Sequence, residues 1–572
     1  MPVRHRLVAV AALLCCASVL WATPASAHAI LLRAEPAPQT TVDDAPDAVR
    51  LHFSEPVEVA FGAVRVFDVD GNRVDPGAIS RADGNRQVVL PVDLEDGTYT
   101  VTWRVTSEDG HPVRGGFGFF VGAPSTISAV AVPVDAGAGP VVTWGYGIAR
   151  FLWFGSFIAI AGMVAMRRWV WTPAVRAVGL AHSDAAEGFR RRFRRTLPGA
   201  WVVLVVAGLA ILVFQSATVS GLSLASAARP EVLKELLGTN FGELWIVQII
   251  LAVALGMPVA ALVARRPLLG VSPRAWLVVL GVLVAAQCLA TALNGHARTI
   301  GNTAVMIPSL ALHLLAAAVW AGALGALVVL GRLAWRHVAA ADRPALLRQL
   351  VSRFGKLAVG AVAVLAVTGV VNSVGLLGAV SDLWDVSFGK VVSGKVALLL
   401  VALGLAAIHR FRTPKLLAQP ATAPGAVPAF ERTSAAELVA VTAAVALAAV
   451  LVALVPGRSL ALAAKGPVNQ EKRAGQYTVQ LYIDPTRAGD NEVHVTFVNS
   501  AGLAAAEVAN TEVALGPEGQ ERQPIEMRLI SPGHFVGDTT LPSPGRYQLS
   551  VASAAAEGAT TTFDFRLYDD KR

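Results

Sequence analysis

Apolar residues are concentrated in the middle of this chain, whereas both ends alternate between apolar and polar positions. In the middle, apolar stretches of bilayer-spanning length are separated by short polar connections. Eight such stretches lie at about residues 141–165, 198–220, 241–264, 275–293, 308–330, 355–378, 390–408 and 436–456. The pattern therefore predicts a membrane domain, residues 141–456, built as a bundle of eight transmembrane helices.

The segment before the first span, residues 28–122, predicts a small β domain. Apolar side chains alternate with polar ones at Val49, Leu51 and Phe53, and again between Tyr99 and Val105. Runs of period two separated by Gly, Asp, Asn and Pro turns are typical of the strands of a sandwich or barrel. We expect a linker over residues 123–140 to join this domain to the spans.

The segment after the last span, residues 466–572, predicts a second all-β sandwich outside the membrane. Apolar positions alternate from Tyr477 to Ile483. Its potential soft or imidazole ligands, His494, Met527 and His534, are widely separated in sequence and show no metal-binding spacing. We therefore expect a packing or docking role for this domain.

Composition and charge agree with a multi-pass membrane protein. Of the 572 residues, 54% are hydrophobic and only 15% are charged. The net charge of +8 does not indicate a nucleic-acid partner, because the arginines gather in short connections, such as Arg190, Arg191 and Arg192. The first, third, fifth and seventh connections are the basic ones, so the positive-inside rule places them in the cytoplasm and both termini outside the cytoplasmic membrane.

The first 27 residues predict a secretory signal peptide. Basic residues precede the apolar run Leu7–Trp21, and Ala25-Ser26-Ala27 fits an A-x-A cleavage site. Cleavage there makes His28 the first residue of the mature chain. A terminal histidine offers an amine and a ring nitrogen to one metal ion, and both suit Cu(II).

Asp109 and His111 are candidates to complete a metal site with His28. In an extended chain, side chains two residues apart share a face, and Pro112 favours an extended backbone at His111. The alternative for this segment is a hairpin turn with a solvated histidine. His52 alternates with buried apolar neighbours, so we expect it on the solvated face of its strand and not as a ligand.

Cys288, Met306 and His313 suggest a route for copper inside the membrane. Cys288 and His313 lie about five residues inside the outer ends of their spans, which is roughly 7–8 Å deep at about 1.5 Å per residue. Ionisable side chains in hydrocarbon are costly and indicate function, and sulfur and imidazole suit Cu(I). His296, in the connection between these spans, would serve at the entry. Simple burial is the alternative for Cys288, and satisfied packing is the alternative for His313.

Several motifs resemble copper resistance proteins. Three segments are similar to the CopC family: His28-Ala29, the run from Leu51 to Glu58, and the run from Asp109 to Gly115. The eight-span region, with Gly295-His296 and His313-Leu314-Leu315, resembles the CopD family. Over residues 28–460 the chain thus resembles a fusion of CopC with CopD.

This resemblance implies that His28, Asp109 and His111 bind Cu(II), His28 through both its amine and its ring. Some CopC relatives also hold Cu(I) in a methionine-rich stretch. This chain has no methionine between His28 and Met163, so we expect that second site to be absent.

Together these features predict a protein of copper homeostasis and resistance. We expect Cu(II) capture outside the membrane and copper transport inward, with a copper chaperone or reductase as a further partner and no enzymatic activity. Copper sequestration without transport is one alternative. A copper-dependent oxidative enzyme is another, although the anionic Asp109 would occupy a position that oxygen needs.

One glycine placed ahead of His28 in the mature chain should weaken Cu(II) binding by roughly an order of magnitude or more, because the amine and the ring would no longer chelate together. The metal displaces a proton from an amine whose reference pKa is about 7.7–8.0. A spectroscopic Cu(II) titration measures the effect, and equal affinity in the extended protein would rule out the terminal chelate.

Overall fold

The computed structural model describes residues 29, 31–38, 40–59, 64–69, 72–76, 78–107, 110, 112–122, 139–264, 268–298, 300–335, 337–419, 423–463, 467–499, 505, 507–531, 533–553 and 559–567.

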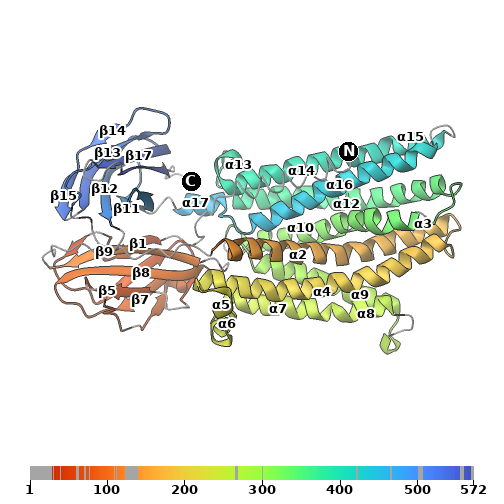
Figure 1. The fold of residues 1–572 in the computed structure, drawn as a ribbon, viewed down its shortest axis with the longest axis horizontal. Helices are drawn as coiled ribbons and strands as arrows, with labels where there is room; N and C mark the ends of the chain where they lie inside the picture. Colours follow the sequence, from red (N-terminus) through yellow and green to blue (C-terminus); the bar gives the residue numbers. More distant parts are fainter. Residues whose placement is uncertain are drawn as a thin grey trace. The chain divides into compact units, whose positions relative to one another are not determined.

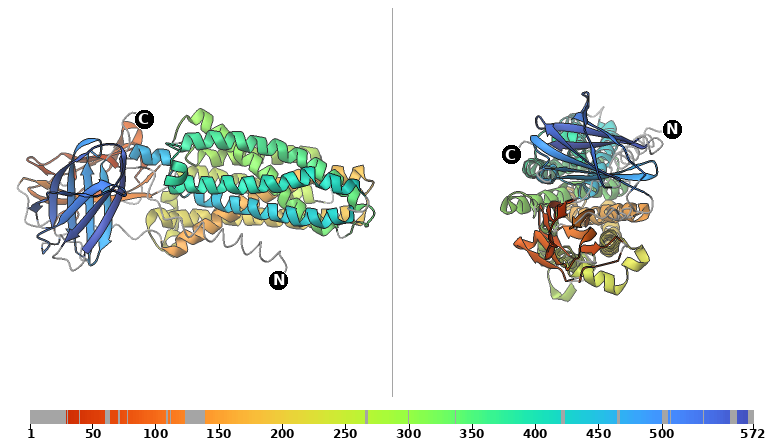
Figure 2. Two further views of the ribbon diagram at one scale, coloured as in Figure 1. Left: turned by 90° about the horizontal axis from the view of Figure 1, so that it is seen from above. Right: turned by 90° about the vertical axis from the view of Figure 1, so that its left-hand side faces the viewer.

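Eight helical segments among the described residues are long and apolar enough to cross a membrane, which confirms the predicted bundle. They run side by side in two perpendicular views (Figures 1 and 2). Their helices are α2 (Pro140–Ala165) with α3 (Thr172–Ala177), α4 (Asp184–Ser220), α7 (Asn240–Ala254) with α8 (Gly256–Val263), α9 (Pro273–Leu293), α10 (Thr303–Ala326), α12 (Arg343–Leu376), α14 (Ser387–Phe411) with α15 (Thr413–Ala418), and α16 (Ala423–Leu451).

Shorter elements connect or extend these helices. Two π-helical turns continue α2 and α10, and five short helices lie in or after the connections. The π-helical turns span Met166–Trp171 and Leu327–Gly331, and the short helices are α5 (Leu224–Ala227), α6 (Pro230–Leu237), α11 (Arg332–Trp335), α13 (Asp382–Asp385) and α17 (Gly457–Ala463).

Helix α10 begins earlier than the hydropathy pattern predicted. Asn302 caps it by accepting a hydrogen bond from the Ala304 amide at 3.1 Å, and Pro308 lies inside the helix. His313 is therefore ten residues from the start of α10, about 15 Å along the axis. Cys288 lies five residues before the end of α9, about 7–8 Å along that helix. The sequence suggested that the two residues are equally far from the ends of their helices. In the structure these two distances differ.

Helices α2 and α10 approach closely at a pair of glycines. A Cβ atom on Gly162 would lie 1.9 Å from the carbonyl carbon of Gly322, and one on Gly322 would lie 2.0 Å from the Ile158 carbonyl oxygen. Small residues permit such close backbone packing in membranes, where helix association depends on van der Waals contact. This contact positions α10, which also packs against α9, α12 and α16.

The N-terminal β domain consists of two sheets over a shared apolar core. One sheet has the strand order β1-β3-β7-β6; in the other, β2-β9-β8-β4 are joined by β5, which pairs with β8. Buried residues such as Leu51, Val101 and Phe119 fill the space between them. The strands are β1 (Leu31–Glu35), β2 (Thr41–Val42), β3 (Ala48–Phe53), β4 (Val57–Glu58), β5 (Val64–Phe67), β6 (Ser80–Ala82), β7 (Gln87–Pro91), β8 (Gly97–Ser107) and β9 (Pro112–Val121).

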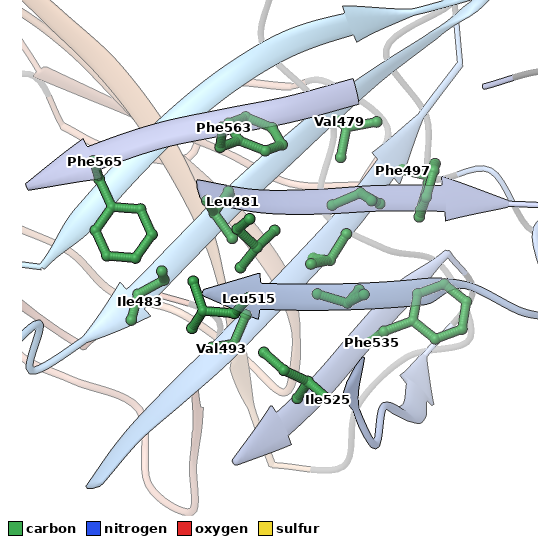
Figure 3. Packing of buried hydrophobic residues seen from close by; sticks show 14 of the residues in the cluster. Val479, Leu481, Ile483, Val493, Phe497, Leu515, Ile525, Phe535, Phe563 and Phe565 are labelled. Carbon is green, nitrogen blue, oxygen red and sulfur yellow. The ribbon is translucent and has the colours of Figure 1, made fainter. Parts of the chain in front are cut away.

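The C-terminal β domain also has two sheets, ordered β10-β11-β12-β16-β15 and β14-β13-β17-β18. Their core contains Leu481, Val493, Phe535 and Phe563 (Figure 3). The strands are β10 (Val468–Ala474), β11 (Tyr477–Asp484), β12 (Gly489–Val498), β13 (Glu512–Pro517), β14 (Gln523–Ile525), β15 (Arg528–Ser531), β16 (His534–Leu541), β17 (Gly545–Ser553) and β18 (Ala559–Leu567). The predicted fold class, two all-β domains and a helical membrane domain, is confirmed.

Replacing Gly162 by alanine should destabilise the bundle by about 1–3 kcal/mol, because backbone atoms occupy the position of the added Cβ. The matched control is Gly155→Ala in the same helix, where a Cβ would meet no atom within 4 Å. Alanine at Gly155 should be neutral or stabilising by about 0.5–1 kcal/mol. Thermal unfolding in detergent compares the two variants, and equal stability would contradict the close approach.

Candidate metal-binding sites

His28, Asp109 and His111 lie outside the described residues, so their arrangement stays a prediction. The structure describes the backbone beside them: Ala29 is buried in the N-terminal core, and Thr106 on β8 pairs with Pro112 on β9. Gly110 adopts a positive φ of 89°, and its amide donates to the Ser107 carbonyl at 2.8 Å. The segment that carries Asp109 and His111 is therefore the connection of a β8–β9 hairpin.

His52 makes cross-strand contacts on the face of β3 opposite the buried Leu51 and Phe53. Its Nε2 lies 3.1 Å from Nε2 of Gln87 on β7 and 3.9 Å from Oε1 of Glu35 on β1. Neighbouring strands therefore already supply polar contacts for this ring.

His313 lies at the contact of α10 with α12. Its Nδ1 is 3.0 Å from Oγ1 of Thr368, whose hydroxyl donates to the Val364 carbonyl at 2.6 Å. Since that hydroxyl has a single proton, Oγ1 accepts from Nδ1–H of His313. The neutral ring then carries its free lone pair on Nε2, which is the tautomer that a metal ligand requires.

Met306 lines the same contact as His313. They are seven positions apart in sequence, so they share a face of α10, about 10 Å apart along the helix. A Cβ atom on Gly375 of α12 would lie 2.3 Å from the Met306 sulfur, and one on Gly369 would lie 3.6 Å from Cε1 of His313. Both potential copper ligands therefore face α12, at positions where that helix has glycine.

Cys288 and His296 make other contacts. Cys288 is buried on α9, where the neighbouring Gln287 and Thr291 both bond to Gln248 of α7, at 3.3 and 3.0 Å. The ring of His296 meets Phe388 edge-on, with centroids 6.4 Å apart. Within the described ranges, no three side chains of His, Cys, Asp or Glu group together as a metal site. The four predicted membrane residues therefore do not form a single cluster.

Two histidine contacts were not predicted from the sequence. His409 is buried on α14 with its Nε2 3.4 Å from Oε2 of Glu437 on α16. In the C-terminal domain, Nδ1 of His494 lies 3.1 Å from Nε2 of His534. The second pair forms because β12 pairs with β16, and the spacing of the two histidines in the sequence does not reveal that pairing.

The pKa values of both histidines in the His494–His534 pair are shifted downward by burial. Burial lowers the pKa of His534 to about 3, and it also lowers the pKa of His494, although the Glu492 carboxylate opposes that shift. Oε1 of Glu492 lies 2.6 Å from Nε2 of His494.

Three protein families match successive parts of the chain. The CopC domain family matches residues 31–122, the family "Copper resistance protein D-like, N-terminal domain" matches 141–305, and the family "Copper resistance protein D" matches 348–451.

Among curated proteins, the copper transport protein CutJ of Bacillus subtilis (strain 168) is 28% identical over 395 residues, covering 68% of this chain and 69% of CutJ. The copper resistance protein C of Xanthomonas campestris pv. juglandis is 33% identical over 113 residues, covering 18% of this chain and 88% of that protein. Protein YobA of Escherichia coli (strain K12) is 36% identical over 98 residues, covering 17% of this chain and 79% of YobA.

Among solved structures, CopC from Methylosinus trichosporium OB3b is 37% identical and has a TM-score of 0.16, covering 17% of this chain and 95% of that one. PcoC, a methionine-rich copper resistance protein from Escherichia coli, is 27% identical with a TM-score of 0.15, covering 17% of this chain and 99% of PcoC.

Replacing His111 or Asp109 by alanine should each weaken Cu(II) binding, because each substitution removes a proposed ligand. His52→Ala is the matched control and should leave the affinity unchanged, since Gln87 and Glu35 already contact that ring. Spectroscopic titration of the three variants decides the assignment. Unchanged affinity in His111→Ala would mean that the site lies elsewhere.

Proposed function

The chain belongs to the copper resistance family that joins a CopC domain to a CopD membrane domain, and on that premise we propose that it captures Cu(II) outside the cell membrane and moves copper inward. The observation that carries this proposal is the union of both domains in one chain, together with His313 and Met306 on one face of α10.

Capture would take place at the N-terminal domain through His28, Asp109 and His111. Two nitrogens of one terminal residue, a second imidazole and a carboxylate form a ligand set that suits Cu(II). Asp109 and His111 belong to the connection between β8 and β9, so the proposal rests on their closeness in sequence and not on an extended backbone, since Gly110 between them has a positive φ. This arrangement would hold the ion outside the membrane until it is transferred.

Passage would follow the contact between α10 and α12. His313 would offer Nε2 to the ion, since Thr368 accepts the proton on Nδ1. Met306 would offer a thioether two helical turns away, with His296 at the entry. Cys288 would be a secondary ligand, because it lies on α9 and not on this face of α10.

The proposed route also requires a change of copper oxidation state. Thioether and thiol ligands favour Cu(I), whereas the external site suits Cu(II). One electron per ion would therefore come from a separate reductase or a reducing chaperone.

His313→Ala should abolish copper movement and leave Cu(II) capture by the N-terminal domain intact, because it removes the imidazole at the α10–α12 contact. The matched control is His182→Ala, which removes an exposed histidine between α3 and α4. Cys288→Ser should have a smaller effect than His313→Ala. Cellular copper at equal membrane expression is the measurement, and wild-type accumulation by His313→Ala would contradict the route.

Direction is tested separately with radiocopper in sealed vesicles. Under reducing conditions, right-side-out vesicles should accumulate copper, and inverted vesicles should lose preloaded copper faster than vesicles carrying His313→Ala. The reverse pattern would establish export. Binding without movement in either orientation would establish sequestration.

A further inference from the structure

Helices α14 and α16, which pack side by side, bury a carboxyl group next to an imidazole (Figure 1). Glu437 on α16 is 1% exposed, and its Oε2 lies 3.4 Å from Nε2 of His409 on α14. Neither oxygen of Glu437 has a hydrogen-bond partner among the described residues. An ionisable group buried in a membrane domain is costly to keep, and such groups typically serve a function.

The contacts of His409 leave its Nε2 as an acceptor. Nδ1 lies 3.4 Å from Oγ1 of Thr433, whose own proton goes to the Ala429 carbonyl at 2.9 Å. Oγ1 therefore accepts from Nδ1–H, and the neutral ring carries a lone pair on Nε2, the atom beside Glu437. One proton on Oε2 of Glu437 would give that lone pair a donor and remove an uncompensated charge from the bundle.

A cavity lies directly beside this pair. Ser434 and Phe430 of α16 line it, and both contact His409. The Ser434 hydroxyl oxygen lies 3.5 Å from Nε2, and the Phe430 ring meets the imidazole edge-on with centroids 4.8 Å apart. About 30 Å³ of the cavity is open to the centres of water molecules, more than the roughly 10–15 Å³ that one buried water needs. A water molecule in the cavity would thus lie one hydroxyl group away from the imidazole.

The cavity leads toward the basic end of the bundle. The π-helical turn Leu327–Gly331 of α10 forms another part of its wall, and such turns are frequent at functional sites. Arg332 and Glu431 complete the lining at this end, where they form an ion pair at 3.5 Å. Their side chains are 31% and 27% exposed, so this end of the cavity reaches solvent.

The charged groups near the pair are mostly cations. At this end of the bundle, the charged residues of the elements around the pair are Arg332, Arg343, Arg348, Arg353, Lys356 and Lys415, together with Arg410, Glu431 and Arg432 on the two helices themselves. Their positive charge offsets the loss of a proton from Glu437, whereas burial of that carboxyl group opposes the loss. The two effects act in opposite directions, which makes the proton exchangeable.

We propose that His409 and Glu437 form a proton-binding site of the membrane domain, reached from the basic end of the bundle through this cavity. Ser434 relays the proton between cavity water and the pair. Release of the proton leaves one negative charge near α10, which packs against α16, and that charge attracts a passing cation. The proton therefore leaves as a copper ion approaches and returns as the ion departs, a step that rests on the proposed function.

The proton site is tested without copper, on the full chain in detergent. An infrared difference spectrum between acidic and alkaline solution should contain the band of a protonated carboxyl group in an apolar setting. Glu437→Gln should remove this band, and His409→Gln should shift it. The matched control is Glu187→Gln, which removes a 59% exposed carboxylate paired with Arg190 and should leave the band in place.

An unchanged spectrum in Glu437→Gln would overturn the proposal, as would a native protein without the band. Thermal unfolding of each variant verifies that the bundle is folded. Because two different residues are replaced, loss of folding in one variant still leaves the other to decide.

The link to copper is tested in inverted vesicles preloaded with copper, where the outer solution reaches the basic end of the bundle. Acidifying that solution should slow copper loss several-fold, because the protonated pair no longer attracts the cation. Glu437→Gln, which is uncharged at every pH, should lose copper at the slow rate regardless of pH, whereas Glu187→Gln should behave like the native protein.

An equal pH response in the native protein and Glu437→Gln would overturn the link between proton and copper. Failure of the native protein to move copper at any pH would instead contradict the proposed transport, and the infrared spectra would still decide whether the pair binds a proton.

Discussion

The close contact of α2 with α10 is the constraint on which the membrane domain depends. At Gly162 and Gly322 the two backbones lie so near that neither position has room for a Cβ atom. Hydrocarbon supplies no hydrophobic force between helices, so this contact has to come from close backbone packing. It holds α10 among α2, α9, α12 and α16, and thereby directs one face of α10, with Met306 and His313, toward α12.

Several polar side chains in the bundle have partners on other helices. Thr368 contacts His313, Gln248 joins Gln287 and Thr291, and Gln215 accepts from the Tyr146 hydroxyl. Each contact lowers the cost of placing a polar group in the membrane. His313 is distinguished within this set because its partner takes only the Nδ1 proton, which leaves the other ring nitrogen available to a ligand.

The two β domains use histidine in contrasting ways. His52 lies on a partly exposed face and takes its contacts from neighbouring strands. His494 and His534 are buried side by side, and a carboxylate orients one of them. The difference follows from strand position, since β12 is paired on both edges and is buried on both faces over most of its length. A buried imidazole pair gives up hydration, so its ring nitrogens take their hydrogen bonds from each other and from Glu492.

The sequence by itself predicted the eight spans and the two β domains, because the periods of helix and strand and the length of a bilayer crossing are local properties of the chain. It placed the start of α10 too late, because Pro308 interrupts the apolar pattern while Asn302 still caps the helix. The N-terminal copper ligands were also inferred from sequence, through a cleavage motif and a resemblance.

Only the tertiary structure decided which distant side chains meet. Sequence spacing grouped Cys288 with His313 by depth alone, whereas helix packing turned His313 toward Thr368. The same spacing dismissed His494 and His534, which strand pairing brings to 3.1 Å. Periodicity states which face of an element is buried, but helix packing and strand order determine which element covers that face, and both arise from contacts far apart in the chain.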